Sequence, residues 1–284
     1  MSEKSVKDVS LKRFEGDSEC DVEDLVAVEE PLEIRVGYYD GDIFRHKAVS
    51  ITMRTPGEDF ELAVGFLFTE KIIASKDDIS QIKHCGPEDA AGRENTVRVD
   101  LKKGVEVDLK SLDRHFYTTS SCGVCGKSSI EALSYGMSAD TLSSNSSFSV
   151  APDVVSKFPS ALTSVQAIFE TTGGLHASAL FSADGELDVV REDVGRHNAL
   201  DKLIGSRLLA GALPIHDTAL FLSGRISFEL VQKALAAGIP LIAAVGSPSS
   251  LAVELAEEYG ITLVGFVRNG RFNVYCGAER IRSA

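Results

Sequence analysis

The clearest chemical signal in this 284-residue chain is a pair of cysteines, Cys122 and Cys125. Serine and glycine surround them from Ser120 to Lys127, which favours an exposed turn that brings the two sulfur atoms together. A helical pattern begins at Lys127, and a helix N-terminus beside a positive charge makes a thiol more acidic and more reactive. The motif fits a redox dithiol, half of a zinc site or a sulfur relay. An incidental pair of small buried residues is disfavoured by the polar neighbours.

The other cysteines and histidines do not complete a zinc site. Cys20, Cys85 and Cys276 are isolated in the sequence, whereas a structural zinc site needs four ligands, usually in two close pairs. A zinc deaminase has His-x-Glu before its cysteine pair, but here His176 follows the pair and Ser178 stands where the glutamate is needed. We therefore expect neither a metal site nor deaminase chemistry. A thioredoxin-like oxidoreductase is disfavoured because its motif belongs early in a smaller βαβ pattern.

Composition excludes several classes of partner. The formal net charge of −13 argues against non-specific nucleic-acid binding, which requires a broad basic surface. No apolar run approaches the length of a membrane span, and the charged stretch 1–19 lacks the apolar core of a secretory signal. Five cysteines, an odd number, favour a reducing compartment over a disulfide framework. We expect a cytoplasmic protein with no nucleic-acid or membrane partner.

The first part of the chain divides into a tail and a small α+β domain. Residues 1–25 are highly charged with little periodicity, so we expect a mobile or loosely docked tail. Residues 26–115 alternate as half-buried strands do, around a helix over 55–70 with a capping box made by Thr55 and Glu58. The expected strands are Pro31–Val36, Ile43–Met53, Ile79–Cys85 and Asn95–Leu101, with a turn over 37–41.

Residues 116–284 predict an α/β domain that begins with the cysteine loop, 118–127, and contains a Ser/Asn-rich linker over 141–150. Strands that alternate with helices imply a largely parallel sheet covered on both faces. The Asn269-Gly270 pair favours a tight hairpin, so the last strand should be antiparallel. The expected strands are 175–181, 187–191, 218–222, 241–245, 262–267 and 271–275, and the expected helices are 160–169, 195–209, 227–237 and 249–259.

In such a sheet, ligands bind at the carboxyl ends of strands, against helix N-termini. Three segments have this form: Ser223–Arg225, Gly246–Ser250 and Arg191–Asn198. Arginine suits phosphate because its guanidinium binds two oxygens at once. The candidate binding residues in these segments are Arg196, His197, Ser223 and Arg225. The structural alternatives are a helix cap for Ser247-Pro248, an Arg225–Glu229 surface pair, a hydrogen-bonding role for His197, pairing of Arg196 with Asp193 or Asp201, and core packing for His176.

Together these motifs resemble the FdhD/NarQ family of formate dehydrogenase accessory sulfurtransferases. The resemblance covers residues 30–276 and excludes the tail before residue 25. The segments that carry it are Ser121–Lys127, Arg191–Lys202, Pro31–Ile34, Leu62–Leu67, Thr172–Ala177, Ser223–Ser227, Leu251–Ala256 and Gly265–Phe272.

The resemblance implies that the protein takes persulfide sulfur from a cysteine desulfurase. It would pass this sulfur to the molybdenum (or tungsten) bis-guanine-dinucleotide cofactor before the cofactor enters the formate dehydrogenase apoenzyme. Cys122 matches the persulfide-bearing position and Cys125 its partner. Cys276 stands where relatives more often have threonine. One segment matches the cofactor-binding stretch of the family: Phe266, Val267, Arg268, Asn269, Gly270 and Arg271. GDP is the expected analogue of the cofactor at this segment.

For the fold, the resemblance implies a homodimer whose C-terminal domain is a three-layer mixed sheet like that of cytidine deaminase, without the zinc chemistry. Physical chemistry adds that an exposed Ser/Gly loop can carry a mobile persulfide, and that Arg268 and Arg271 could bind diphosphate on an otherwise acidic protein. The plain alternative for Asn269-Gly270 is an ordinary hairpin turn. Two other functions stay open: a cofactor-binding chaperone without sulfur transfer, and a dithiol oxidoreductase with a reversible Cys122–Cys125 disulfide.

Overall fold

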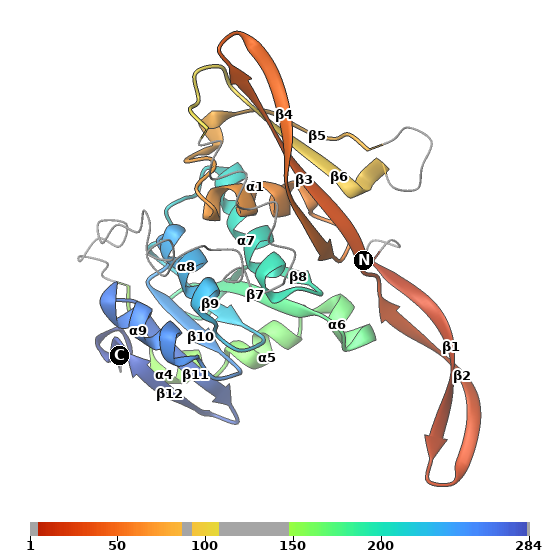
Figure 1. Ribbon diagram of the computed structural model, residues 1–284. Helices are drawn as coiled ribbons and strands as arrows, with labels where there is room; N and C mark the ends of the chain where they lie inside the picture. Colours follow the sequence, from red (N-terminus) through yellow and green to blue (C-terminus); the bar gives the residue numbers. More distant parts are fainter. Residues whose placement is uncertain (1–4, 87–92, 108–147, 283–284) are drawn as a thin grey trace.

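The computed structural model describes residues 5–86, 93–107 and 148–282, so Cys122 and Cys125 lie outside the described residues. Its strands form three sheets: a pair β1-β2, four strands in the order β4-β3-β6-β5, and six in the order β12-β11-β10-β9-β7-β8. Figure 1 shows an N-terminal hairpin, an N-terminal unit and a larger C-terminal unit. Helices combined with mixed sheets confirm the predicted α/β class. The likeness to the cytidine-deaminase fold stays a prediction.

The N-terminal unit is a four-stranded sheet with one helix on its inner face. Strand β3 pairs antiparallel with β4 and parallel with β6, and β5 pairs antiparallel with β6. Alternation along β3 places Leu32, Ile34 and Val36 on one face, where they form a buried cluster with Leu62 and Leu67 of α1. The elements are β3 (Glu30–Asp40), β4 (Ile43–Arg54), α1 (Asp59–Thr69), η1 (Lys76–Asp78), β5 (Ile79–His84), η2 (Arg93–Asn95) and β6 (Thr96–Leu101).

The C-terminal unit has three layers, with apolar clusters on both faces of its six-stranded sheet. Strands β9, β10 and β11 are parallel, and β7, β8 and β12 run antiparallel to their neighbours. Its elements are α4 (Pro152–Val155), α5 (Phe158–Thr163), α6 (Ala167–Thr172), β7 (His176–Phe181), β8 (Leu187–Asp193), α7 (Arg196–Ala210), β9 (Ala219–Leu222), α8 (Phe228–Ala236), β10 (Leu241–Ala244), α9 (Ser250–Glu258), β11 (Thr262–Arg268), β12 (Arg271–Cys276) and η4 (Ala278–Arg280).

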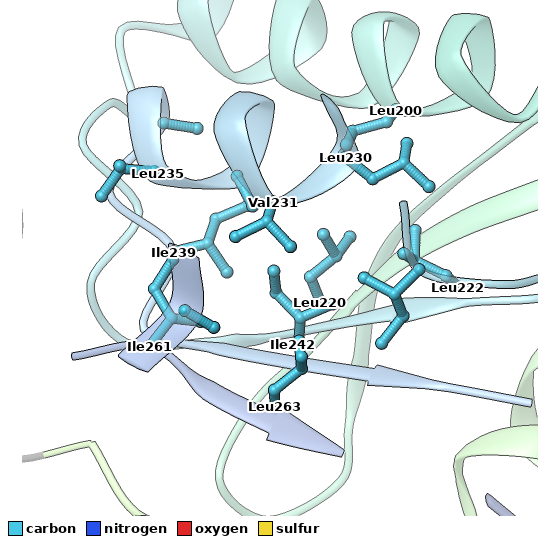
Figure 2. Packing of buried hydrophobic residues seen from close by; sticks show 14 of the residues in the cluster. Leu200, Leu220, Leu222, Leu230, Val231, Leu235, Ile239, Ile242, Ile261 and Leu263 are labelled. Carbon is cyan, nitrogen blue, oxygen red and sulfur yellow. The ribbon is translucent and has the colours of Figure 1, made fainter. Parts of the chain in front are cut away.

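Figure 2 shows how helix α8 covers one face of this sheet. Leu230 and Val231 point down onto Leu220, Ile242 and Leu263, which come from three adjacent parallel strands. All five side chains are at most 1% exposed. Because both faces of these strands are buried, their sequences are continuous apolar runs. On the opposite face the rings of Phe158 and Phe181 stack at 4.3 Å between centroids.

The sequence prediction is wrong about secondary structure in the N-terminal tail. Strands β1 (Val6–Glu15) and β2 (Ser18–Ala27) form an antiparallel hairpin, which we call the arm. Charged residues on both faces hide the alternation that would reveal a strand. A signal was present nevertheless, because Gly16-Asp17 is a favourable two-residue hairpin loop and Gly16 adopts a positive φ of 63°.

Three other local predictions also need correction. The turn predicted over 37–41 is mostly strand, because β3 continues to Asp40. The helix predicted over 160–169 divides at Gln166, whose backbone leaves the helical region, and Glu192 accepts the Phe169 amide of the new helix at 3.1 Å. The capping box fails because α1 begins at Asp59, with no side-chain cap. In contrast, every strand and helix predicted beyond residue 170 is confirmed to within two residues.

The two units meet where helices α1 and α7 touch backbone to backbone. A Cβ placed on Gly65 would lie 1.9 Å from the carbonyl oxygen of Asp201, and one on Gly205 would lie 1.9 Å from that of Glu61. Only glycine permits this approach. Beside the crossing, Lys233 of α8 donates to the buried Asp201 carboxylate at 2.8 and 2.9 Å.

A second buried contact joins the units at the end of β8. The fully buried Asp193 carboxylate lies 2.8 Å from Lys202 Nζ and accepts the backbone N–H of Thr55 at 3.2 Å. Lys202 also donates to the Thr55 carbonyl at 2.9 Å, and Asn198 donates to the other Asp193 oxygen at 3.0 Å. Thr55 also contacts the C-terminal unit through its side chain, because its hydroxyl accepts the N–H of Val194 at 3.2 Å. We call Thr55, Asp193, Asn198 and Lys202 the clamp.

The end of the chain is paired with the start of the C-terminal unit. Val150 donates its N–H to the Arg280 carbonyl at 2.9 Å and accepts the N–H of Arg282 at 3.1 Å. Val150 and Ile281 form an isolated parallel bridge. The first and last described segments of this unit therefore lie side by side.

The contact between α1 and α7 predicts that replacing a helical glycine by alanine destabilises the protein, the opposite of the usual effect. Glycine to alanine inside a helix normally stabilises by about 1 kcal/mol through helix propensity. We expect Gly205→Ala instead to destabilise the protein by about 2 kcal/mol, because the methyl group forces α1 and α7 apart. Urea unfolding measures the change, with Ser206→Ala in the same helix as the control. Equal or greater stability of Gly205→Ala would contradict the backbone contact.

The clamp predicts a large cost for removing its cation. Lys202→Met leaves the buried Asp193 charge without its partner, and we expect a loss of about 3–5 kcal/mol in unfolding free energy. The matched control is Lys157→Met, which removes an exposed ion pair with Asp153 and should cost less than about 1 kcal/mol. Similar losses in the two variants would show that the buried Lys202–Asp193 pair stabilises the fold no more than an exposed ion pair does.

Candidate functional site

The candidate site is the edge of the six-stranded sheet where β9, β10 and β11 end. Because these strands are parallel, the loops that follow them lie side by side. The N–H of Gly246 donates to the carbonyl of Gly224 at 3.0 Å, and the N–H of Phe266 donates to that of Gly246 at 3.1 Å. Strand β7 runs antiparallel to β9, so it starts at this edge, with His176 as its first residue.

Glycines allow the three loops to approach this closely. A Cβ on Gly246 would lie 2.8 Å from the Gly224 carbonyl oxygen, and one on Gly265 would lie 3.0 Å from that of Gly246. A Cβ on Gly224 would lie 3.3 Å from Nδ1 of His176. The edge is therefore a layer of main chain, from which longer side chains project.

Two of those side chains, Arg268 and Arg271, stand directly opposite each other across the last hairpin. Asn269 and Gly270 both have positive φ angles, 52° and 71°, as in the tight turn predicted from the sequence. Both arginines are exposed. Like charges in directly opposite positions destabilise a strand pair, so an anion between them would be favoured.

Phe266 connects this hairpin with the loops. Its φ of 56° places a bulky residue in the left-handed region, at an irregularity of the β11–β12 register. Such strain is typical of functional sites. The guanidinium of Arg268 lies 5.5 Å from the centre of the Phe266 ring, which orients it by a cation–π contact. Val267, the residue between them, is buried in the core.

Arg196 and His197 begin helix α7 at the same edge. Burial lowers the pKa of His197 to about 4, with a further contribution from Lys233, so the ring is neutral near pH 7. Its Nε2 lies 3.4 Å from the Ser227 hydroxyl. As the pH falls, His197 takes up a proton near pH 6.5 in the unfolded chain but only near pH 4 in the folded protein. The free energy of unfolding therefore decreases as the pH falls from about 6.5 towards 4. Burial and then Arg196 lower the pKa of His176 in the same direction.

The structural alternatives for these residues have mixed outcomes. Within the described residues, Asp193 pairs with Lys202 and Asp201 with Lys233, and neither forms an ion pair with Arg196. In the described part of the chain, the Nε atom of Arg196 is buried and has no hydrogen-bond partner. The Ser223 hydroxyl has a structural role, because it accepts the N–H of Ala177 at 2.8 Å. Arg225 is exposed on its loop.

The predicted cap of helix α9 is wrong by two residues. Ser249, not Ser247, is the N-cap, and its hydroxyl accepts the N–H of Ala252 at 3.3 Å. Pro248 is instead part of an isolated bridge to Ile226 in the preceding loop. The Gly246–Ser249 segment thus holds the β9 and β10 loops together before the helix begins.

The cysteines that the structure describes are not paired with one another. Cys276 donates to the Ile261 carbonyl at 3.3 Å, and burial raises the pKa of its thiol, so it is a poor nucleophile. Over residues 5–86, 93–107 and 148–282, no group of three or more histidine, cysteine or acidic side chains could hold a metal ion. No helix in these same ranges is both long and apolar enough to span a membrane.

Sequence reasoning missed the clamp, which holds the loop before Arg196 from both sides. Its signal was the spacing of Asn198 and Lys202, four residues apart on one face of α7. Both side chains are buried, which the usual surface location of lysine does not suggest. The loop is thus supported by Thr55 of the N-terminal unit as well as by its own helix.

Comparison with known proteins assigns the chain to a family. The model of the FdhD/NarQ family matches residues 27–282. "Sulfur carrier protein FdhD" of Mycolicibacterium paratuberculosis is 51% identical over 264 residues, covering 91% of this chain and 92% of that protein. The protein of the same name from Sulfurisphaera tokodaii is 42% identical over 276 residues, covering 97% and 99%.

A solved structure agrees over nearly the full length. The crystal structure of a Desulfotalea psychrophila protein, assigned as a formate dehydrogenase accessory protein, superposes with a TM-score of 0.72. It is 26% identical and the match covers 98% of this chain and 99% of that one. This chain therefore belongs to the FdhD/NarQ family.

Proposed function

We propose that this protein is a persulfide sulfur carrier that supports the maturation of formate dehydrogenase. Sulfur arrives on Cys122 from a cysteine desulfurase and passes to the molybdenum bis-guanine-dinucleotide cofactor before the cofactor enters the apoenzyme. Support comes from the family match and from curated relatives that are named sulfur carriers. We place the reaction in the cytoplasm, in a protein that acts as a homodimer.

The observation that carries the proposal is the cluster of arginines at the sheet edge. On a chain of net charge −13, three exposed arginines lie at one edge: Arg225 in the loop after β9, and Arg268 and Arg271 at the ends of β11 and β12 that flank the last turn. The cofactor is a substrate here, and its diphosphates carry the negative charge that would relieve the repulsion between Arg268 and Arg271. A bidentate guanidinium contact gives this recognition a fixed geometry.

The main chain of the edge also suits phosphate. Helices α8 and α9 both begin here, each with the positive end of its dipole at this edge; in α9 the Ser249 hydroxyl already accepts the N–H of Ala252, whereas, among the described residues, α8 has no such cap. Ser227, the N-cap of α8, makes no side-chain cap bond, which leaves the first N–H groups of α8 open to a ligand. Gly224 and Gly246 let phosphate oxygens approach the backbone without meeting a Cβ.

The residues on α7 and β9 take different roles in this proposal. Arg196, whose Nε is buried and unsatisfied, supplies a further cation to the bound cofactor. His197 is neutral and orients Ser227 beside the start of α8. Ser223 acts by holding the β9 loop against β7 rather than by touching the ligand.

The sulfur chemistry follows from thiol exchange. The Cys122 thiolate attacks the terminal sulfur of the desulfurase persulfide, which leaves Cys122 as the persulfide and releases the desulfurase thiolate. Attack of the Cys125 thiolate on the inner sulfur then releases sulfide to the acceptor and forms a Cys122–Cys125 disulfide. A thiol reductant restores both thiols. These cysteines lie outside the described residues, so their roles rest on the sequence.

Intact-protein mass spectrometry tests the carrier role. After incubation with a cysteine desulfurase and cysteine, we expect the wild type to gain sulfur that reductant removes. Cys122→Ala should not gain it, because the attacking thiolate is absent. Cys85→Ala is the control and should behave as wild type. If the wild type gains nothing but still binds GDP, the protein is a cofactor chaperone without sulfur transfer.

Calorimetric titration with GDP tests the arginine site. Arg271→Ala should weaken GDP binding about tenfold or more, because a charge-assisted hydrogen bond contributes about 1.5–3 kcal/mol. The control is Arg45→Ala, which removes the same charge from an exposed ion pair on the N-terminal unit. Unchanged affinity in Arg271→Ala, or equal losses in both variants, would place the nucleotide elsewhere.

A further inference from the structure

The arm projects away from the rest of the molecule, as Figure 1 shows. It touches the body at its base, where Ser5 donates to the Pro56 carbonyl at 3.0 Å, Val28 donates to the Ser5 carbonyl at 3.0 Å and Ala27 lies against Gly174. Towards its tip, Phe14 is 65% exposed. An isolated two-stranded hairpin is marginally stable in water, so further contacts would stabilise the arm.

The register of the hairpin divides the arm into two faces of different charge. Directly opposite residues share a face. What we call the neutral face has two basic and two acidic residues; the acidic face has one basic and four acidic residues. The neutral face comprises Lys7, Val9, Leu11, Arg13, Glu15, Ser18, Cys20, Val22, Asp24 and Val26, and the acidic face Val6, Asp8, Ser10, Lys12, Phe14, Glu19, Asp21, Glu23, Leu25 and Ala27.

Among the residues that the structure describes, only the acidic face pairs its cation, since Lys12 forms an ion pair with Glu19. In the described parts of the chain, none of the four charged residues of the neutral face has an ion-pair partner. The Asp24 carboxylate accepts only the neighbouring backbone N–H of Leu25, at 2.9 Å. The four residues are Lys7, Arg13, Glu15 and Asp24. The neutral face therefore presents balanced, unused charges around an apolar centre.

These charges have the order that two-fold symmetry requires. From base to tip, the opposite pairs of the neutral face are Lys7 with Val26, Val9 with Asp24, Leu11 with Val22, Arg13 with Cys20, and Glu15 with Ser18. Charges of opposite sign thus lie at equal distances on either side of the Leu11–Val22 pair. A surface with this pattern complements a reversed copy of itself.

Resting on the homodimer proposed above, whose interface has not been assigned, we propose that the neutral face packs against the neutral face of a second copy of this chain, with the arms antiparallel. The two-fold axis passes between the Leu11–Val22 pairs of the two copies. Lys7 then lies opposite the partner's Glu15. Arg13 reaches diagonally to the partner's Asp24. The acidic face, which would repel its own copy, stays outside.

The expected dimer is weak when only this contact is considered. Ten residues per strand at about 3.3 Å each, in a ribbon about 10 Å wide, give an interface of roughly 300 Å² per copy. Stable interfaces bury about 800 Å² per partner. The arm contact alone should therefore produce weak association that increases with protein concentration.

Sedimentation velocity on the full-length protein, from low micromolar to near-millimolar concentration, tests this surface. Asp24→Arg places a second cation against the partner's Arg13, and two-fold symmetry removes two ion pairs at once, so the dissociation constant should rise about tenfold. The double variant Arg13→Asp/Asp24→Arg reverses both charges and should restore wild-type association. The matched control, Glu23→Arg, makes the same charge change one residue away on the acidic face and should not weaken the dimer.

Each alternative outcome overturns the proposal. A wild type that stays monomeric has no such interface, and a dimer unaffected by Asp24→Arg uses another surface. Equal weakening by Glu23→Arg would show that net charge, rather than the neutral face, controls association. Failure of the double variant to recover would reject the Arg13–Asp24 pairing. Far-UV circular dichroism on all variants confirms that the exposed substitutions leave the fold intact.

Discussion

The backbone contact between helices α1 and α7 is the constraint on which the rest of the structure depends. Gly65 and Gly205 let the helices touch, and this brings the end of the N-terminal sheet against the end of β8. The buried carboxylate of Asp193 can then collect donors from both units. The loop that leads to Arg196 is therefore fixed from two directions. The small N-terminal unit acts as a support for the site on the large one.

Periodicity predicts the C-terminal unit well because its central strands β9 and β10 are buried on both faces and each is followed by a helix that packs on the sheet. A short apolar run such as Leu241–Ala244 is compatible with few structures other than a buried strand. The same reasoning fails for the arm, whose strands are exposed on both faces and carry charge on each. Hydrophobic alternation records burial, so it cannot report a strand that the chain itself does not bury.

The place of the candidate site follows from topology, but its side-chain partners do not. Parallel strands bring their following loops together at one edge, which the order of elements already implies. The capping box predicted at Thr55 is locally reasonable, yet its hydroxyl serves Val194, 139 residues away. Likewise Lys202 looks like an ordinary surface residue of a helix until its carboxylate partner is known. Tertiary contacts decide such cases, and local sequence does not contain them.

The pairing of Val150 with the last described segment has a topological consequence. Because the entry and exit of the C-terminal unit lie side by side, its chain path is nearly a closed ring. Such a unit tolerates circular permutation in principle, since joining its ends needs only a short linker. New termini would fit at the exposed Ala183-Asp184 turn between β7 and β8, away from the candidate edge. The order in which this unit's elements are connected is therefore separable from the arrangement that forms the site.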